Sequence, residues 1–471
     1  MTYYMLSHVK RIRLFITTPH GAFVMLATLF GLILICIMPP LQTPDETAHF
    51  LRIYEISELK FVPTQHNGVT GSYLPTSIAT MIKTVNPNSS INFHPNVKYN
   101  LHATKAAMKI PLAPTQRSFY DTSATASYSP VGYLPQALAV LIGRLLHFSP
   151  IFLVYLSRIA ILVSWIGMVC FSIKLIPYRK WTLATIALIP MMVAQSMSLG
   201  VDVLSIGASL LFLVLVLYTS RKETISRKLL IALILASVLM VLSKQIAILF
   251  IPLVFLIDKN KFRTPRKALI VKSLMILIPL LFLLIWMHTS AHVSQTVTQA
   301  ANHQSSSGQV SFLLHKPFHI FKVMFDTFFF SQGDTILTSV IGNFGWMDTP
   351  LSIGIVIAGY CILTITLFCS YNEPVNITKR IRIVSLILAV IYFLGVCLAL
   401  YIAYAPVGFN ILLGVQGRYL LPLLFLLIPV FYSFSYMSKK RYILSTMLPM
   451  VLILCLSITT IIFRYYISYN F

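Results

Sequence analysis

Long apolar segments alternate with short polar ones along most of the chain. A helix that crosses a bilayer needs roughly 20 mostly apolar residues. The segments that approach this length centre on 21–39, 151–173, 181–196, 203–219, 229–243, 246–257, 269–287, 351–370, 383–404, 419–437 and 443–463. The 246–257 segment is short enough to be re-entrant instead. This pattern predicts an all-α integral membrane protein, with one polytopic domain over residues 1–471 and about eleven transmembrane helices.

Composition favours the same class of protein. Of the 471 residues, 57% are hydrophobic and 10% are charged, whereas a soluble domain carries about 25% charged residues. The net charge of +24 is of the kind found in nucleic-acid-binding proteins. Here, however, the basic residues form short clusters between apolar segments, as in the loops on one side of a membrane. The expected partner is therefore the lipid bilayer and not nucleic acid.

The basic clusters also predict the orientation of the chain. Loops rich in lysine and arginine remain in the cytoplasm, and a cytoplasmic N-terminus puts every cluster on that side. The clusters are Lys10/Arg11/Arg13, Lys174/Arg179/Lys180, Arg221/Lys222/Arg227/Lys228, Lys259 through Lys272, Lys379/Arg380/Arg382 and Lys439/Lys440/Arg441. The expected location is the cell (plasma) membrane. An odd number of spans across it then places the C-terminus on the outer side. Most acidic residues fall on that outer side, where we expect the working surface.

Two of the outer loops are long, covering residues 40–150 and 289–350. The apolar part of 128–148 is interrupted by Pro135 and Arg144, which predicts a helix lying in the membrane interface rather than a span. In the second loop, aromatic residues at helical spacing suggest another interfacial helix, although packing against lipid or the core explains them more simply. These aromatic residues are Phe318, Phe321, Phe325 and Phe328.

The sharpest local motif, TPDETAHFLR, follows the first apolar segment. Thr43 and Glu46 have the spacing of a capping box, which accounts for Glu46 structurally. Asp45, His49 and Arg52 are spaced i, i+4 and i+7, on one face of the predicted helix. An acid, an imidazole and a guanidinium on that face are able to position a hydroxyl group and an anion. Acids at helix starts are also common for structural reasons alone.

Further polar residues lie at the outer ends of predicted spans. Asp202 fits either an exposed turn or a functional acid. Lys244 and Gln245 occupy a short gap, where the lysine either binds an anion or reaches the headgroups. Gln416 and Arg418 lie in a glycine-rich segment in which backbone amides and a bidentate arginine suit a phosphate. Interfacial anchoring is the simpler explanation of that segment.

Other motifs carry weaker signals. Trp346 and Asp348, in GNFGWMDTP, are suited to a sugar-binding platform, but the motif is weak alone. The second-loop histidines resemble a metal site in number only, and Pro317 interrupts the pair at 315 and 319, so no zinc site is expected. The six cysteines lie in apolar segments and show no metal or disulfide spacing. The histidines in question are His288, His292, His303, His315 and His319.

Six segments, in order, resemble the bacterial domain-of-unknown-function family 2142, and the resemblance covers about residues 40–435. They are TPDETAHFLRIYEISE, YSPVGYLPQALAVLIGRLL, ALIPMMVAQSMSLGVDVLSIG, LSKQ, GNFGWMDTP and LGVQGRYLLPLL. Many relatives have a His-Pro-Pro element before the second span. This chain has Ser129, Pro130 and Val131 there, so a role of that histidine is not carried over.

That family is similar to the GT-C-like polytopic glycosyltransferases, which use polyprenyl-phosphate sugar donors and place an acid in the first outer loop. The resemblance implies a GT-C-like fold and transfer of a sugar to a cell-envelope glycan on the outer face. Asp45 would act as the base, and Glu46 would support the loop or help to hold a divalent cation. Arg52, Lys244 and Arg418 would contact the donor phosphate.

The chemistry of such a donor matches these residue types. A polyprenyl phosphate leaves as a stabilised anion, so a base and fixed cations suffice, whereas a glycosidase needs two carboxylates. Two alternatives remain open. One is a polysaccharide polymerase or ligase that uses lipid-pyrophosphate donors, and the other is a non-enzymatic lipid-glycan transporter.

Overall fold

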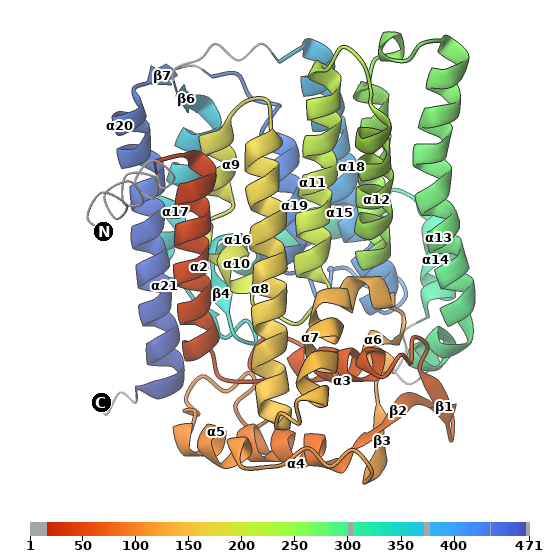
Figure 1. Ribbon diagram of the computed structural model, residues 1–471, viewed down its shortest axis with the longest axis vertical. Coiled ribbons are helices and arrows are strands. Elements are labelled where there is room, and N and C mark those ends of the chain that lie inside the picture. The colour runs from red at the N-terminus through yellow and green to blue at the C-terminus, as the bar shows by residue number, and fades with distance from the viewer. Residues whose placement is uncertain (1–16, 300–304, 372–376, 434, 468–471) are drawn as a thin grey trace, which may run out of the picture.

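Helices dominate the computed structural model, which describes residues 17–299, 305–371, 377–433 and 435–467 (Figure 1). Six helical segments in these ranges are long and apolar enough to cross a bilayer. They are α2 (Pro19–Ile37), α8 (Pro150–Leu175), α11 (Asp202–Arg221), α13 (Pro265–Gln299), α18 (Lys379–Tyr404) and a continuous segment made of α20 (Lys439–Tyr442), η7 (Ile443–Met447) and α21 (Leu448–Tyr466). The predicted class, a mostly helical multi-pass membrane protein, is confirmed. The number of eleven spans stays a prediction.

The remaining apolar segments form shorter or broken helices. Pro190 occupies the first position of one of them. Because proline lacks an amide hydrogen and clashes with the preceding turn, the helix before it ends at Ile186. The shorter elements are α9 (Lys180–Ile186), α10 (Pro190–Gln195), α12 (Arg227–Ser243), η3 (Gln245–Leu256), α17 (Ile353–Phe368), η6 (Gly417–Leu420) and α19 (Leu421–Leu427).

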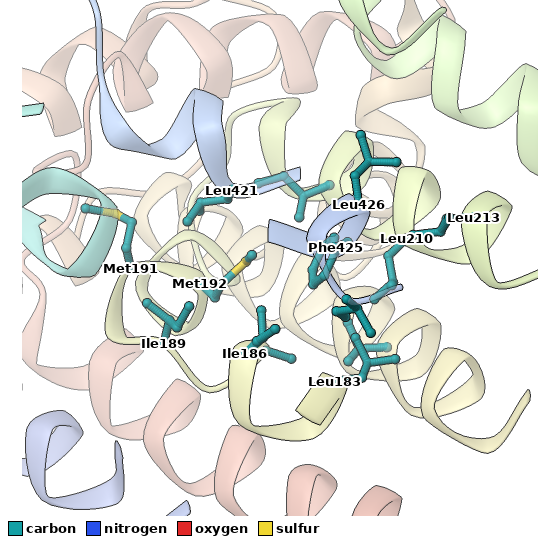
Figure 2. Packing of buried hydrophobic residues seen from close by; sticks show 14 of the residues in the cluster. Leu183, Ile186, Ile189, Met191, Met192, Leu210, Leu213, Leu421, Phe425 and Leu426 are labelled. Atoms are coloured by element: carbon teal, nitrogen blue, oxygen red, sulfur yellow. The ribbon is translucent and has the colours of Figure 1, made fainter. Parts of the chain in front are cut away.

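The broken helices α9 and α10 lie in the middle of the bundle. Figure 2 shows Ile186 of α9 and Met192 of α10 among the side chains of α11 and α19, including Leu210 and Phe425. Of the apolar window of α11, 83% is buried, against 28–44% for the other five long segments. Irregular backbone at membrane depth is tolerated where protein covers it, so the interruption at Pro190 falls in a sheltered place.

The two ends of the bundle differ in character (Figure 1). The end that carries the segment 40–149, at the bottom of the figure, is called the loop end below. The opposite end is called the basic end, and it carries the connections with most of the lysine and arginine clusters. There β6 (Cys369–Tyr371) pairs in parallel with β7 (Ser435–Met437), and the short turn η4 (Lys259–Lys261) follows η3.

The 3-10 helix η3 runs the length of α11. Before it, Lys244 pairs with Asp202 at the start of α11. After it, the Lys261 ammonium donates to the carbonyl of Lys222, just beyond the end of α11, at 2.6 Å. A 3-10 helix rises about 2.0 Å per residue, so twelve residues reach about 24 Å instead of the roughly 18 Å of an α-helix. The stretched geometry lets this short segment connect both ends, which a re-entrant turn would not do.

The first loop folds into a compact layer at the loop end. Its helices are α3 (Glu46–Ser57), α4 (Thr76–Val85), η1 (Pro87–Ser89), α5 (Leu101–Met108), α6 (Ser123–Ala126), η2 (Pro130–Tyr133) and α7 (Leu134–Leu145). An antiparallel sheet, unforeseen from the sequence, joins β1 (Thr64–His66), β2 (Val69–Pro75) and β3 (Arg117–Asp121) in that order, with Gly71 opposite both Thr64 and Asp121. A Cβ at Gly71 would lie 2.1 Å from the Tyr120 carbonyl oxygen, so the close strand pairing requires glycine.

Helix α7, predicted to lie in the membrane interface, is amphipathic. Its buried side includes Gln136 and Val140, while Leu134, Leu138 and Ile142 are exposed. These exposed leucine and isoleucine side chains recur every four residues and therefore form one apolar stripe. Twelve residues are too few to cross a bilayer as an α-helix, so α7 suits a position at the membrane surface.

The second loop contains α14 (Ser306–His315), α15 (His319–Asp326), the π-helical turn η5 (Thr327–Ser331), α16 (Gly333–Ile341) and the short strands β4 (Asn343–Phe344) and β5 (Thr349–Pro350). The predicted aromatic row divides. Phe318, Phe321 and Phe325 are exposed, whereas Phe328 packs against Phe393 of α18 with ring centroids 5.3 Å apart.

Candidate functional site

Helix α3 begins at Glu46, and Asp45 precedes it in the left-handed conformation with φ 59°. The side chain of Asp45 makes no capping hydrogen bond, and 54% of it is exposed. The backbone N–H of Thr43 donates to Glu46 Oε2 at 3.2 Å, while the Thr43 hydroxyl has no hydrogen-bond partner. Of the two hydrogen bonds of the predicted capping box, only the one accepted by Glu46 is present. The side chain of Asp45 takes no part in capping the helix.

Glu46 is fully buried and belongs to the structural framework. Its two carboxylate oxygens accept from Nε and Nη2 of Arg158 in α8, each at 2.7 Å. The same guanidinium donates to the carbonyls of Met38 and Pro39 at 2.8 and 2.9 Å. All three nitrogens of Arg158 therefore make short hydrogen bonds, and this arginine holds the start of the first loop against the bundle.

Four charged side chains from separate segments meet at the loop end. Arg418, in η6, lies 3.5 Å from a carboxylate oxygen of Asp45 and 3.5 Å from one of Asp202, the first residue of α11. Asp202 also pairs with Lys244, which lies between α12 and η3. We call these four residues the charge cluster. The sequence motifs that contain them are far apart, and the tertiary fold brings them together.

Tyr419 and His49 complete the surroundings of the charge cluster. The ammonium of Lys244 lies 4.1 Å from the centroid of the Tyr419 ring, a cation–π arrangement. The Arg418 guanidinium donates to the Tyr419 hydroxyl at 3.3 Å, and its Nε, although buried, has no hydrogen-bond partner. Arg418 thus retains unused donor capacity, unlike Arg158.

His49 lies under the cluster as a neutral imidazole. Its Nδ1 is 2.7 Å from the hydroxyl of Tyr133 in η2. Burial lowers the pKa of His49 to about 4, the charges of Asp45 and Asp202 opposing this shift and those of Arg418 and Lys244 adding to it. His49 therefore supports the cluster without adding a charge at neutral pH.

Arg52 lies on α3 but outside the cluster. It is completely buried, and its Nη1 donates to Glu55 and its Nη2 to the carbonyl of Phe61, both at 2.5 Å. Glu55 also accepts from the hydroxyl of Ser72 in β2. Of the predicted polar stripe on this helix, Asp45 and His49 face the cluster, whereas Arg52 holds the loop sheet against α3.

Trp346 and Asp348 contact residues outside the charge cluster, and the sugar-binding platform stays a prediction. Asp348 Oδ2 accepts from Nη2 and Nε of Arg464, in the last helix, at 2.6 and 3.1 Å. Arg464 in turn donates to the carbonyls of Ile91 and Val97 in the first loop, both at 2.9 Å. Asp348 therefore orients an arginine that connects the C-terminal helix with the first loop. Trp346 stacks on Phe93 with ring centroids 5.2 Å apart.

The two predicted glutamines lie beside the cluster. Gln245 is exposed and follows Lys244 directly. Gln416 lines, with Arg418, a small cavity of about 30 Å³ that also borders Thr43 and Pro44. A cavity of this size holds a few waters at most, so an organic ligand has to approach from the exposed side of Asp45.

A divalent cation between Asp45 and Glu46 does not fit this geometry. Both Glu46 oxygens already accept hydrogen bonds from Arg158, and the nearest charged partner of Asp45 is a guanidinium. In the described part of the chain, no three His, Cys, Asp or Glu side chains are grouped as metal ligands. His303 lies outside the described residues.

Several residues of the site were not predicted from the sequence. Arg158 carried a usable signal, because an arginine inside an apolar span is costly and needs a buried partner. Tyr419, Tyr133 and Arg464 carried none, since tyrosines and arginines at the ends of spans are ordinary interfacial anchors.

Comparison with known proteins gives one match. Residues 28–427 match the model of a family described as "Predicted membrane protein (DUF2142)", which agrees with the resemblance found in the ordered motifs. No curated protein and no solved structure matches the chain.

Proposed function

The chain belongs to the DUF2142 family of predicted membrane proteins, and we propose that it is a membrane glycosyltransferase of the GT-C-like type. It transfers a sugar from a polyprenyl-phosphate donor to a cell-envelope glycan. The active surface is the loop end, which faces outward, and the basic end faces the cytoplasm of the cell. This orientation follows from the lysine and arginine clusters at the basic end.

The observation that carries the proposal is the contrast between two buried arginines. Arg158 makes four hydrogen bonds of 2.7–2.9 Å. Arg418 reaches its two acids only at 3.5 Å, through Nη2 to Asp45 and through Nε to Asp202, and its Nε makes no hydrogen bond. Charge-assisted hydrogen bonds normally measure about 2.7–2.9 Å. Arg418 is therefore underused as a donor, next to the one acid of the motif that is exposed, Asp45.

A donor phosphate would take the place of Asp45 on Arg418. Phosphate oxygens suit the planar guanidinium fork, and the loose contact with Asp45 is exchanged easily. Lys244 adds a second cation, and Asp202 orients both cations through the contacts described above. Once Arg418 is occupied by phosphate, the carboxylate of Asp45 no longer contacts its cationic neighbour.

The transfer step then needs a single proton acceptor. Asp45 takes the proton of the acceptor hydroxyl while the hydroxyl oxygen bonds to the anomeric carbon of the sugar. The bond from that carbon to the phosphate oxygen breaks, and its electron pair leaves with polyprenyl phosphate. Arg418 and Lys244 stabilise the extra negative charge as it develops. No strong acid is required, because the leaving group is already a stable anion.

The interior of the bundle favours an enzyme over the transporter alternative. A transporter for a polar glycan needs a hydrophilic passage between the two faces. In this protein the interior of the bundle, between the loop end and the basic end, is filled by the buried apolar side chains of α9, α10, α11 and α19 (Figure 2).

The test is an in vitro transfer assay with purified protein in liposomes. Polyprenyl-phosphate sugars and polyprenyl-pyrophosphate glycans are supplied separately with envelope glycan as acceptor, and the released lipid is identified by mass spectrometry. Release of polyprenyl monophosphate, abolished by Asp45→Asn and retained by Asp334→Asn, supports the proposal. Release of pyrophosphate instead identifies a polymerase or ligase. Glycan movement across the liposome membrane without a new glycosidic bond identifies a transporter.

A further inference from the structure

We propose that the basic end carries a second binding site, specific for a phosphate group and separate from the charge cluster. A pocket of about 550 Å³ opens there between the start of α2, the connection from α8 to α9, β6 and α20. Among the described residues, its lining contains three cationic side chains, Arg179, Lys180 and Lys439, and no acidic one. The site lies at the opposite end of the bundle from Asp45, so it does not depend on the proposed function.

Arg179 is the central cation of this pocket. Its side chain is buried, with 8% of the residue exposed. Its guanidinium donates to the carbonyls of Leu367 and Phe431 at 2.6 and 2.8 Å and to the hydroxyl of Ser433 at 2.8 Å. All three acceptors are neutral. Among the described residues no carboxylate lies within 4 Å of it, since none of the ion pairs there involves Arg179.

Arg179 and its neighbour Tyr178 also have unused donors. Arg179 Nε and the Tyr178 hydroxyl are both buried without a hydrogen-bond partner. Burial raises the pKa of Tyr178, so its hydroxyl keeps its proton and remains available as a donor. A buried cation with no anionic partner among the described residues and a buried donor without an acceptor are each unfavourable. An anion in the pocket would compensate the charge of Arg179, and both side chains belong to residues of the pocket lining.

The two lysines reach the same pocket from different elements. Lys439 Nζ donates to the carbonyl of Thr17 at 2.7 Å and lies 5.6 Å from the ring of Trp181. Lys180 Nζ donates to the carbonyl of Lys174 at 2.9 Å. Each ammonium has three donor hydrogens and is held by a neutral carbonyl, so both retain the charge and the donors to bind an anion.

A phosphate group fits this set of donors better than a carboxylate does. It offers three or more acceptor oxygens in a tetrahedral arrangement, which suits a guanidinium, a tyrosine hydroxyl and two ammonium groups approaching from different sides. The phosphate is carried either by an acidic phospholipid or by a soluble phosphorylated molecule. Basic pockets between transmembrane helices commonly bind lipid headgroups, and Trp181 and Tyr442 in the lining are typical of the membrane interface.

The experiment compares two pairs of lysine substitutions at the same end of the bundle. The pocket variant is Lys180→Gln with Lys439→Gln. The control, Lys228→Gln with Lys267→Gln, removes the same charge from exposed positions outside the lining. Tyr178→Phe removes only the unpartnered hydroxyl. Each protein is delipidated in neutral detergent and titrated with inorganic phosphate, and separately with micelles of phosphatidylglycerol or phosphatidylcholine.

Binding is measured by native mass spectrometry and by the shift in melting temperature. We expect the pocket variant to bind the phosphate-bearing probe on the order of 25-fold more weakly, about fivefold for each lysine, and Tyr178→Phe to bind it several-fold more weakly. The control pair keeps wild-type affinity. Binding of phosphatidylglycerol alone identifies a lipid site, and binding of inorganic phosphate identifies a soluble ligand. Equal losses in both lysine pairs, or no saturable binding of either probe to the wild type, overturn the proposal.

Discussion

Glu46 and Arg158 form a buried two-point ion pair, with both N–O distances at 2.7 Å, although 112 residues separate them in the chain. The preceding residue, Asp45, is exposed and touches Arg418 only at 3.5 Å. Two adjacent acids thus have opposite environments. Glu46 holds the first loop to the bundle, whereas Asp45 is free to react. Substitution of Glu46 should therefore affect the stability of the protein, and substitution of Asp45 should affect the reaction.

Glu46→Gln is expected to destabilise the protein severely. The substitution leaves Arg158 as a buried charge without its partner, which costs about 3–5 kcal/mol. The capping box alone would have made this change mild, because glutamine can replace glutamate there. Melting temperature and yield in detergent measure the effect. A variant that melts like the wild type would show that the ion pair contributes little.

Asp45→Asn is expected to leave folding intact and to abolish most glycan transfer. Asp45 makes no capping hydrogen bond, whereas the loss of a general base lowers a rate about 10²–10⁴-fold. Transfer is followed in the liposome assay, with the melting temperature as the folding control. Transfer at the parental rate in Asp45→Asn would refute the proposed role of this carboxylate.

Arg418→Ala should weaken binding of the lipid-phosphate donor about 10- to 100-fold, the usual effect of losing a hydrogen bond to a charged group. Arg418→Lys should restore part of the affinity, because lysine keeps the charge but lacks the planar fork. The matched control is Arg117→Ala, at the same end but paired with Glu58 at the surface. Donor affinity is measured by equilibrium binding. Equal affinities in all three variants would reduce Arg418 to an interfacial anchor.

His49 is expected to make the protein less stable in mild acid. Its folded pKa of about 4 lies below the ordinary value of 6.5, so the unfolded chain binds the proton more readily. The stabilisation is present above pH 6.5 and is lost as the pH falls towards 4. Between pH 7 and pH 5 the loss is about 2 kcal/mol. Melting temperatures of the wild type and His49→Gln are compared at the two pH values. The same pH dependence in both would exclude His49 as its source.

The orientation is tested with single cysteines in a background without the native ones. Asn67→Cys, in the exposed turn between β1 and β2, should react with an impermeant maleimide in intact cells. Thr224→Cys, in the exposed connection between α11 and α12, should react only after permeabilisation. Both positions are exposed, so a difference in reactivity reports sidedness rather than burial. The reverse pattern would place the loop end in the cytoplasm.

The sequence by itself determined the class of the protein and the order of its apolar segments. Spans in a bilayer must be apolar over about 20 residues, so hydropathy along the chain identifies them without any knowledge of their packing. The helix at 134–145 was predicted from a local feature too, since Pro135 and Arg144 interrupt its apolar segment. The position of Asp45 directly after the first span was also a local feature.

Only the tertiary structure decided which polar residues meet. Local spacing grouped Asp45, His49 and Arg52, yet Arg52 turns to Glu55, and Glu46 turns to Arg158. Asp202 contacts both Lys244, 42 residues away in the chain, and Arg418, because α11, η3 and η6 begin at the same level of the bundle. Hydrophobic periodicity tells which face of a helix is buried, but not which neighbour covers it. Partners of buried charges are set by long-range packing, and no local pattern records that packing.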